Sequence, residues 1–271
     1  MNEDTIRKKF QREDKNDIRG KNIEAVNRFI EMLKKQENST NINIRKIAEN
    51  FENIDKIAPN FVIFQCPNGT KCNFMKSCNG YQIGTNTSSI VASHEFGHAV
   101  LEISGNNKVP NEFEGILERA KQHAKSPEIK EFFKEYIIKI CDSNNPDVTE
   151  EEKGPVSDII SAVFQVQAFN INREGNTFFL PSSHKTNYYY DENNKDLNLY
   201  GIYDECFANF YALESENCIK EINALKNLFG VEFLSLFENA LNLSTEKICK
   251  RIEDKDNQYI NNESSIEDKE R

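Results

Sequence analysis

The stretch SSIVASHEFGHAVLEISG, residues 88–105, decides the fold class and contains the residues with the most specific chemistry. Ser88 or Ser89 is suited to begin a helix, because serine side chains accept hydrogen bonds from the first turn. Gly105 is suited to end it, because glycine tolerates the left-handed conformation that follows a last turn. The residues between them are largely apolar, so we expect a buried helix over this stretch.

Within this helix, His94, Glu95 and His98 form the pattern HExxH. Residues four apart lie about 40° from each other around a helix axis, so both imidazoles can bind one metal ion. Glu95 is rotated by about 100° from His94, so its carboxylate can reach a water on that metal without binding the metal itself. Two imidazoles suit Zn²⁺, which in catalytic sites takes three protein ligands and a water. The pattern predicts a zinc site with Glu95 as the general base of amide hydrolysis.

The segment SHEFGHAV, residues 93–100, resembles the active-site helix of the zincin metallopeptidases. The metzincin class would require Gly at position 101 and His at position 104, where this chain has Leu101 and Ser104. The gluzincin class takes its third ligand from a later helix. The E-x-F-A core of DECFANF, residues 204–210, resembles the third-ligand helix of the anthrax lethal factor type of gluzincin. This resemblance implies that Glu205 is the third zinc ligand.

The same resemblance assigns roles to residues around Glu205. Tyr200 or Tyr203 is expected to donate a hydrogen bond to the oxyanion of the tetrahedral intermediate. Many gluzincins carry a carboxylate one helical turn after the third ligand, where it orients a zinc-bound histidine. This chain has Asn209 there, so its side-chain carbonyl would have to accept that hydrogen bond.

Two other residues remain open as the third ligand. Asp158 lies at the start of an apolar segment, where a helix-start charge or a hydrogen bond to a ligand is the simpler interpretation. His184 lies in the predicted loop before Glu205 and could reach the site, although an ordinary loop histidine is the more frequent case. More than a hundred residues separate His98 from Glu205, and an inserted helical subdomain would account for this distance.

A second resemblance covers residues 60–240. The order HEFGHAV, VSDIISA, HKTNYYY and DECFANFYAL is similar to metallopeptidase domains encoded in phage head-gene regions and related mobile elements. It leaves an alternative to the peptidase hypothesis open. In that alternative, an inactive zincin-like structural or phage-associated protein keeps the metal for folding or partner binding.

The predicted fold is α+β and zincin-like: a small mixed sheet packed on the active-site helix, with a mainly helical C-terminal half. FVIFQC, residues 61–66, has the composition of a strand, and NGYQIGTN, residues 79–86, is expected to be the edge strand that binds an extended peptide. We expect a helical, partly disordered segment at residues 1–55, the metallopeptidase domain at 56–250 and a charged flexible tail at 251–271.

Apolar residues at three- and four-residue spacings predict the other helices. The predicted helices cover residues 23–33, 44–51, 112–124, 127–141 and 156–169. A long loop with one short strand at 177–180 follows, and further helices are predicted from residue 204 onward.

Composition narrows the choice of partners. The chain has 34 Lys and Arg against 44 Asp and Glu, and its net charge of −10 argues against nucleic acid or an anionic membrane as a partner. No apolar run reaches the roughly 18 residues of a membrane span, and the start MNEDTIRKKFQRED lacks the apolar segment of a signal peptide. Seven cysteines, an odd number, favour reduced thiols. We therefore expect a cytoplasmic protein that acts on a peptide or protein.

Overall fold

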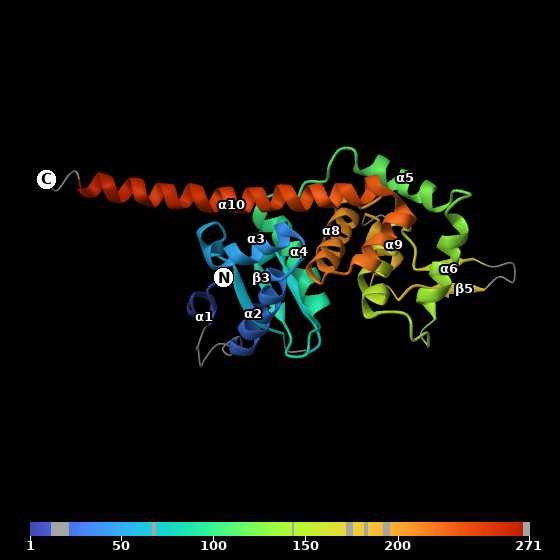
Figure 1. Ribbon diagram of the computed structural model, residues 1–271, viewed down its shortest axis with the longest axis horizontal. Coiled ribbons are helices and arrows are strands. Elements are labelled where there is room, and N and C mark those ends of the chain that lie inside the picture. The colour runs from blue at the N-terminus through green and yellow to red at the C-terminus, as the bar shows by residue number, and fades with distance from the viewer. Residues whose placement is uncertain are drawn as a thin grey trace. The chain divides into compact units, whose positions relative to one another are not determined.

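The structure is a computed structural model that describes residues 1–11, 22–66, 69–142, 144–171, 176–181, 184–191 and 196–267. The chain forms two compact units (Figure 1). The first consists of Met1–Asn106 and Leu241–Arg271, and the second of Asn107–Ala240. The predicted boundary between residues 55 and 56 therefore lies inside the first unit.

The first unit contains the strands predicted near residues 61–66 and 79–86 and the helix that carries the HExxH pattern. Its elements are α1 (Glu3–Phe10), α2 (Ile23–Glu37), α3 (Ile42–Asn50), a 3₁₀ turn (Phe51–Lys56), β1 (Val62–Gln65), β2 (Cys72–Met75), a second 3₁₀ turn (Lys76–Cys78), β3 (Gly80–Ile83), α4 (Ser89–Ser104) and the part of α10 (Val231–Glu267) from Leu241 onward. The predicted helices at 23–33, 44–51 and 88–105 are confirmed. The expected disorder before residue 22 falls largely on residues 12–21, which lie outside the described residues.

Among the described residues, this unit contains a small mixed sheet in the order β1-β3-β2. β1 runs parallel to β3, with Ile63 opposite Tyr81, and β2 runs antiparallel to it, with Phe74 opposite Tyr81. The prediction that residues 79–86 form the edge strand was wrong, because β3 is paired on both sides. The two edge strands are β1, which residues 61–66 predicted, and β2, which was not predicted. Its four residues include the exposed Asn73, so neither length nor alternation marked it as a strand.

An aromatic cluster joins the N-terminal helices, the sheet and α4 into one core. The ring of Phe29 on α2 lies 4.9 Å from that of Tyr81 and 5.4 Å from that of Phe96, and Phe51 lies 5.7 Å from Phe96. The Tyr81 hydroxyl donates to the carbonyl of Ala92 on α4 at 2.6 Å. Since α2 and α3 supply part of this core, residues 22–55 do not form a separate segment.

Helix α10 continues through Glu267, well past residue 251, where a flexible tail was predicted. Within the first unit, Ile252 is buried, and the Arg251 guanidinium donates to the carbonyls of Ile57, at 3.1 Å, and Ile103. These contacts keep the start of the predicted tail in the helix. None of the described helices has the length and apolar character needed to cross a membrane.

The second unit is mainly helical, as predicted. Its elements are α5 (Phe113–Ala124), α6 (Lys130–Cys141), a π-helical turn (Glu152–Val156), α7 (Ser157–Phe164), the antiparallel pair β4 (Ala168–Asn170) and β5 (Thr177–Phe179), a 3₁₀ turn (Thr186–Tyr189), α8 (Leu199–Ser215), α9 (Ile219–Phe229) and the first residues of α10. An α+β fold class is therefore confirmed for the chain.

Two helix ends in this unit differ from the prediction. Helix α7 ends at Phe164 rather than near residue 169, because Gln165 is left-handed (φ 54°) and its amide caps the helix carbonyls of Ala162 and Val163 at 2.6 and 2.7 Å. Helix α8 begins five residues before Asp204, inside the predicted loop. Its N-cap is Asn198, whose side chain accepts a hydrogen bond from the backbone of Gly201 at 2.9 Å.

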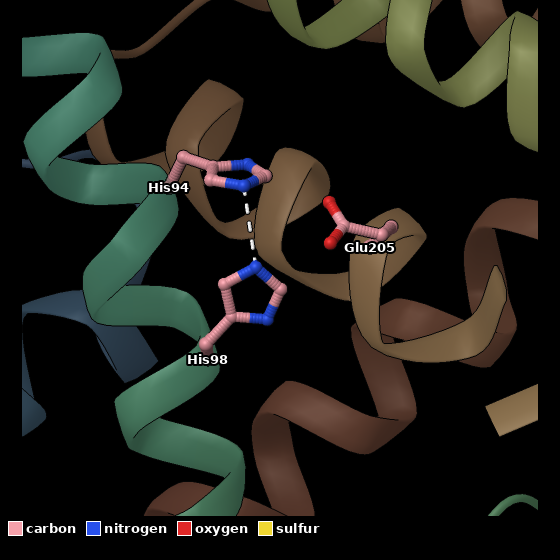
Figure 2. Close-up of side chains that lie close together, drawn as sticks. All are labelled: His94, His98 and Glu205. Atoms are coloured by element: carbon pink, nitrogen blue, oxygen red, sulfur yellow. Dashed lines mark hydrogen bonds between the residues drawn. The ribbon is translucent and has the colours of Figure 1, made fainter. Parts of the chain in front are cut away.

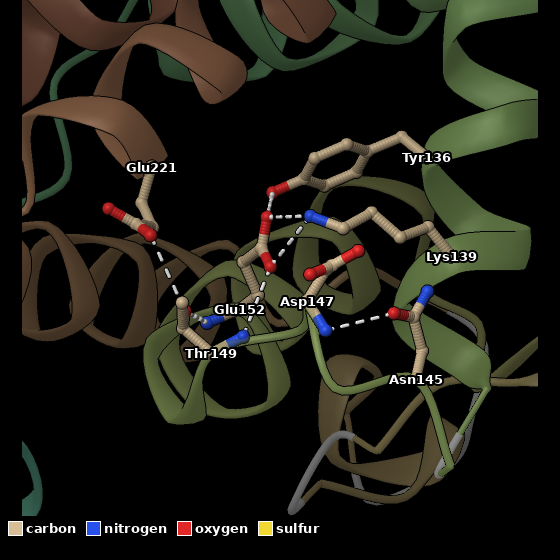
Figure 3. A network of polar contacts seen from close by, with 7 residues as sticks. All are labelled: Tyr136, Lys139, Asn145, Asp147, Thr149, Glu152 and Glu221. Atoms are coloured by element: carbon tan, nitrogen blue, oxygen red, sulfur yellow. Dashed lines mark hydrogen bonds and ion pairs between the residues drawn. The ribbon is translucent and has the colours of Figure 1, made fainter.

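A buried carboxylate organises the middle of the second unit (Figure 3). Glu152 and Thr149 cap the same helix start reciprocally: the Thr149 N–H donates to the carboxylate at 3.2 Å, and the Glu152 N–H donates to Oγ1 at 3.1 Å. Lys139 Nζ lies 2.7 and 2.9 Å from the two carboxylate oxygens, and the Tyr136 hydroxyl donates to the carboxylate at 3.2 Å. Because Glu152 is 1% exposed, these donors replace its water shell.

We expect Glu152→Gln to lower the free energy of unfolding at pH 7 by about 1–3 kcal/mol. Burial raises the pKa of Glu152, but the hydrogen bonds from Lys139 and Thr149 outweigh it, and the pKa lies below its ordinary value of 4.5. The stabilisation is therefore complete above pH 4.5 and is lost as the pH falls through the lower folded-state pKa. Denaturant titrations at pH 7 and pH 3 measure the free energy of unfolding of wild type and Glu152→Gln, with Glu150→Gln at an exposed site as control. If Glu152→Gln lowered the free energy of unfolding equally at both pH values, the ionised carboxylate would not be the source of the stabilisation.

Candidate metal centre

Helix α4 holds the HExxH residues between two well-defined ends. Ser88 precedes it in extended conformation, and Gly105 follows it with φ 65°. The Gly105 N–H donates to the carbonyl of Glu102 at 3.0 Å, and the Asn106 N–H donates to that of Leu101 at 3.1 Å. This is the Schellman pattern, which requires a left-handed residue and therefore favours glycine here. Both predicted end positions are confirmed, although the Ser88 side chain makes no capping hydrogen bond.

The rotation of α4 about its axis places the two histidines on one side. Phe96 lies about 200° around the helix from both His94 and His98 and packs into the aromatic core with Phe29 and Phe51. His94 and His98 therefore point away from that core, although His98 is only 7% exposed. The packing of one apolar side chain thus orients two imidazoles.

The spacing between the two imidazoles suits a shared metal ion. The Nε2 atoms of His94 and His98 lie 3.2 Å apart, with the rings nearly perpendicular at 88°. Two nitrogens that each lie about 2.0–2.1 Å from a tetrahedral zinc are about 3.3 Å apart. The observed separation is close to this value.

Glu205 is the third residue of the candidate group. It lies on α8 and is 5% exposed. Together with His94 and His98 it makes up a group of side chains that could hold a metal ion (Figure 2). Two imidazoles and a carboxylate are a donor set that zinc accepts, so the residues present fit this metal.

Within the second unit, His184 and Tyr188 hold the Glu205 carboxylate. The Tyr188 hydroxyl donates to Oε1 at 2.7 Å, and His184 Nε2 lies 3.1 Å from Oε2. Burial and the nearby carboxylate raise the pKa of Tyr188 above its ordinary value, so this hydroxyl keeps its proton. The sequence analysis considered His184 as a ligand but gave Tyr188 no role. The tyrosine cluster directly after His184 was the available signal.

The Glu95 carboxylate is tied to an edge strand of the first unit. Its Oε2 accepts a hydrogen bond from the backbone N–H of Phe74 on β2 at 2.8 Å. This contact holds the predicted general base beside the strand edge. No sequence pattern indicated it, because the donor is a backbone group of a strand that was not predicted.

The predicted oxyanion tyrosines lie in different surroundings. Tyr203 is 1% exposed and packs against Phe113 and Phe237, with ring centroids 5.3 and 5.8 Å away. Burial raises its pKa to about 12. It points away from Glu205 because residues two apart on a helix lie about 200° apart. The structure therefore does not support Tyr203 as a substrate contact. Tyr200, in the first turn of α8, is 39% exposed and stays a prediction.

Two further predicted residues have structural positions of their own. Asp158 is buried in the first turn of α7 and is not part of the metal-binding group found among the described residues. Asn209 donates from Nδ2 to the backbone carbonyl of Glu205 at 2.9 Å, one turn back on α8. Its expected role as an acceptor for a zinc-bound histidine stays a prediction.

Comparisons with protein-family models, with curated proteins and with solved structures gave no match for this chain.

We expect the full chain to bind about one zinc ion, and we expect His98→Ala to lose it, because a single imidazole and a carboxylate leave the ion with too few protein ligands. Elemental mass spectrometry after dialysis measures the zinc content of both proteins. His123→Ala is the matched control, since His123 is exposed on α5 and lies outside the metal-binding group. Equal zinc content in wild type and His98→Ala would exclude this metal centre.

Proposed function

We propose that this chain is a zinc-dependent endopeptidase with a zincin-like active site, in which His94, His98 and Glu205 bind the metal. The observation that carries the proposal is the 3.2 Å separation of the two Nε2 atoms on α4, and the buried Glu205 carboxylate completes a group that could hold a metal ion. A general base adjacent to the first histidine in sequence distinguishes this arrangement from a purely structural metal site.

When bound, zinc would polarise the scissile carbonyl and lower the pKa of a water to about 7. The protein's own contribution is to move the proton. The Glu95 carboxylate accepts a proton from the attacking water and passes it to the nitrogen of the leaving amine. The Phe74 N–H donates to one Glu95 oxygen at 2.8 Å, which leaves the other oxygen to accept that proton.

The edge of β2 is the proposed binding surface for the peptide. The Gly84 N–H donates to the carbonyl of Lys71 at 2.9 Å, so these two residues form a hydrogen-bonded pair of the antiparallel ladder. Because such pairs alternate along the strands, the backbone N–H and C=O of Asn73 point toward β3. Those of Cys72 and Phe74 point away from β3, to the outer edge of the sheet. An extended peptide can add to this outer edge. Phe74 already contacts Glu95, so a peptide bound along β2 would pass beside the general base.

We expect Glu95→Gln to retain zinc and to lower the rate of peptide hydrolysis by about 10²–10⁴-fold, because the amide cannot accept the water's proton. The assay uses a broad peptide library with zinc present and mass spectrometry to identify cleaved bonds. Glu114→Gln, at an exposed glutamate on α5, is the matched control.

Zinc-dependent cleavage at equal rates by wild type and Glu95→Gln would remove Glu95 from the mechanism. If zinc binds through the three ligands but neither protein cleaves any peptide, the inactive structural alternative replaces the proposal. Unfolding on metal removal, without any proteolysis to lose, would then be the expected behaviour.

A further inference from the structure

A short segment of the second unit surrounds the Glu205 carboxylate with two side chains. The His184 and Tyr188 rings stack with their centroids 4.2 Å apart and their planes at 24°. From this stack, the Tyr188 hydroxyl reaches Oε1 of Glu205 at 2.7 Å, and His184 Nε2 lies 3.1 Å from Oε2. Each carboxylate oxygen therefore has its own partner. We call this pair the His184–Tyr188 clamp.

The segment that carries the clamp is attached to α7 and to the start of β4. The Gln167 side chain donates to the backbone carbonyl of His184 at 2.8 Å. Tyr189, which is fully buried, donates from its hydroxyl to Ser161 Oγ on α7 at 3.1 Å. The Tyr189 ring also lies edge-on to that of Tyr188, with centroids 5.6 Å apart. These contacts fix both ends of the segment.

Asn198 attaches the same segment to the helix that carries Glu205. The Asn198 backbone N–H donates to the carbonyl of Tyr189 at 3.0 Å. The Asn198 side-chain nitrogen donates to the carbonyl of Tyr188 at 3.4 Å, and its side-chain oxygen accepts from the Gly201 N–H. A Cβ at Gly201 would lie 2.4 Å from the Asn198 amide, so only glycine leaves room for this arrangement. The clamp and its target are thus held by one connected set of hydrogen bonds.

A carboxylate oxygen has two acceptor positions, so one that accepts a hydrogen bond can still bind a metal. The last torsion of a glutamate side chain normally takes a broad range of angles. Contacts to both carboxylate oxygens restrict rotation about this torsion. An ordered ligand loses less entropy when the metal binds. Hydrogen bonds to a ligand commonly change metal affinity by about 10–100-fold.

We infer that His184 and Tyr188 are positioning residues that set the zinc affinity of the site by holding Glu205, and that neither is itself a zinc ligand. This inference rests on the proposed function, because it takes Glu205 as the third ligand. It also gives His184 a role different from the ligand role that the sequence left open.

Zinc affinity of the full chain, measured by competition with a chromophoric chelator, tests the clamp. We expect Tyr188→Phe and His184→Phe each to weaken zinc binding by about tenfold, since each keeps the ring stack and removes one polar contact. Tyr190→Phe, in the same segment, is the matched control and should bind zinc as tightly as wild type. Thermal unfolding of the metal-free proteins shows whether the variants fold.

A double-mutant cycle separates positioning from other effects. In a Glu205→Gln background that retains weak zinc binding, adding Tyr188→Phe should change the affinity far less than in wild type. An equal tenfold loss in both backgrounds would overturn the inference, because the effect would not act through Glu205. If Glu205→Gln abolishes zinc binding, the cycle cannot be completed. In that case the inference is overturned if Tyr188→Phe and His184→Phe both fold and bind zinc as tightly as wild type.

These outcomes are distinct from failure of the proposed function. Zinc binding that depends on Glu205 but is unchanged by both clamp substitutions refutes the clamp and leaves the metal centre intact. Absence of zinc binding by wild type, or wild-type affinity in Glu205→Gln, refutes the metal centre and the clamp with it.

Discussion

The packing of Phe96 against Phe29 and Phe51 fixes the rotation of helix α4, and the positions of both histidines follow from it. A helix with only one apolar face could rotate slightly and still bury that face. Here the Tyr81 hydroxyl also binds the Ala92 carbonyl, so the sheet and the helix are aligned along the axis as well. The core therefore sets the direction in which the two imidazoles point, whereas their 3.2 Å spacing follows from their positions four residues apart on one helix.

The carboxylate of Glu205 is positioned in a different way. Its helix, α8, is buried on most sides, but a glutamate side chain has several torsions that helix packing does not determine. Its orientation depends on donors from the segment that precedes α8 in the sequence. Under the proposed function, two histidines positioned by core packing and one glutamate positioned by Tyr188 and His184 would respond differently to mutation. Changes around α4 should affect folding and metal together, whereas changes around Tyr188 should affect the metal first.

The sequence predicted the parts of the structure that local rules determine. The ends of α4 followed from Ser88 and Gly105, and the pairing of His94 with His98 followed from helical periodicity. Strand β2 could not be predicted, because its four residues form a strand through pairing with β3 rather than through their own propensity. The contact between its backbone and Glu95 was hidden for the same reason.

The tyrosines show a second limit of sequence reasoning. Tyr203 lies close to Glu205 in the chain but faces the aromatic core, since α8 begins earlier than predicted and both residues lie within one regular helix. Tyr188 lies seventeen residues before Glu205 yet contacts it. Proximity in sequence did not indicate that Tyr188 contacts Glu205, and only the folded positions of residues 184–189 show this contact.

We propose that two imidazoles and one carboxylate bind zinc, and X-ray absorption at the zinc edge of the zinc-loaded full chain identifies the ligand atoms. We expect a nearest shell of nitrogen and oxygen at about 2.0–2.1 Å, with the outer-shell scattering of two imidazole rings. Sulfur scattering at about 2.3 Å would instead assign the metal to cysteines and exclude the proposed site.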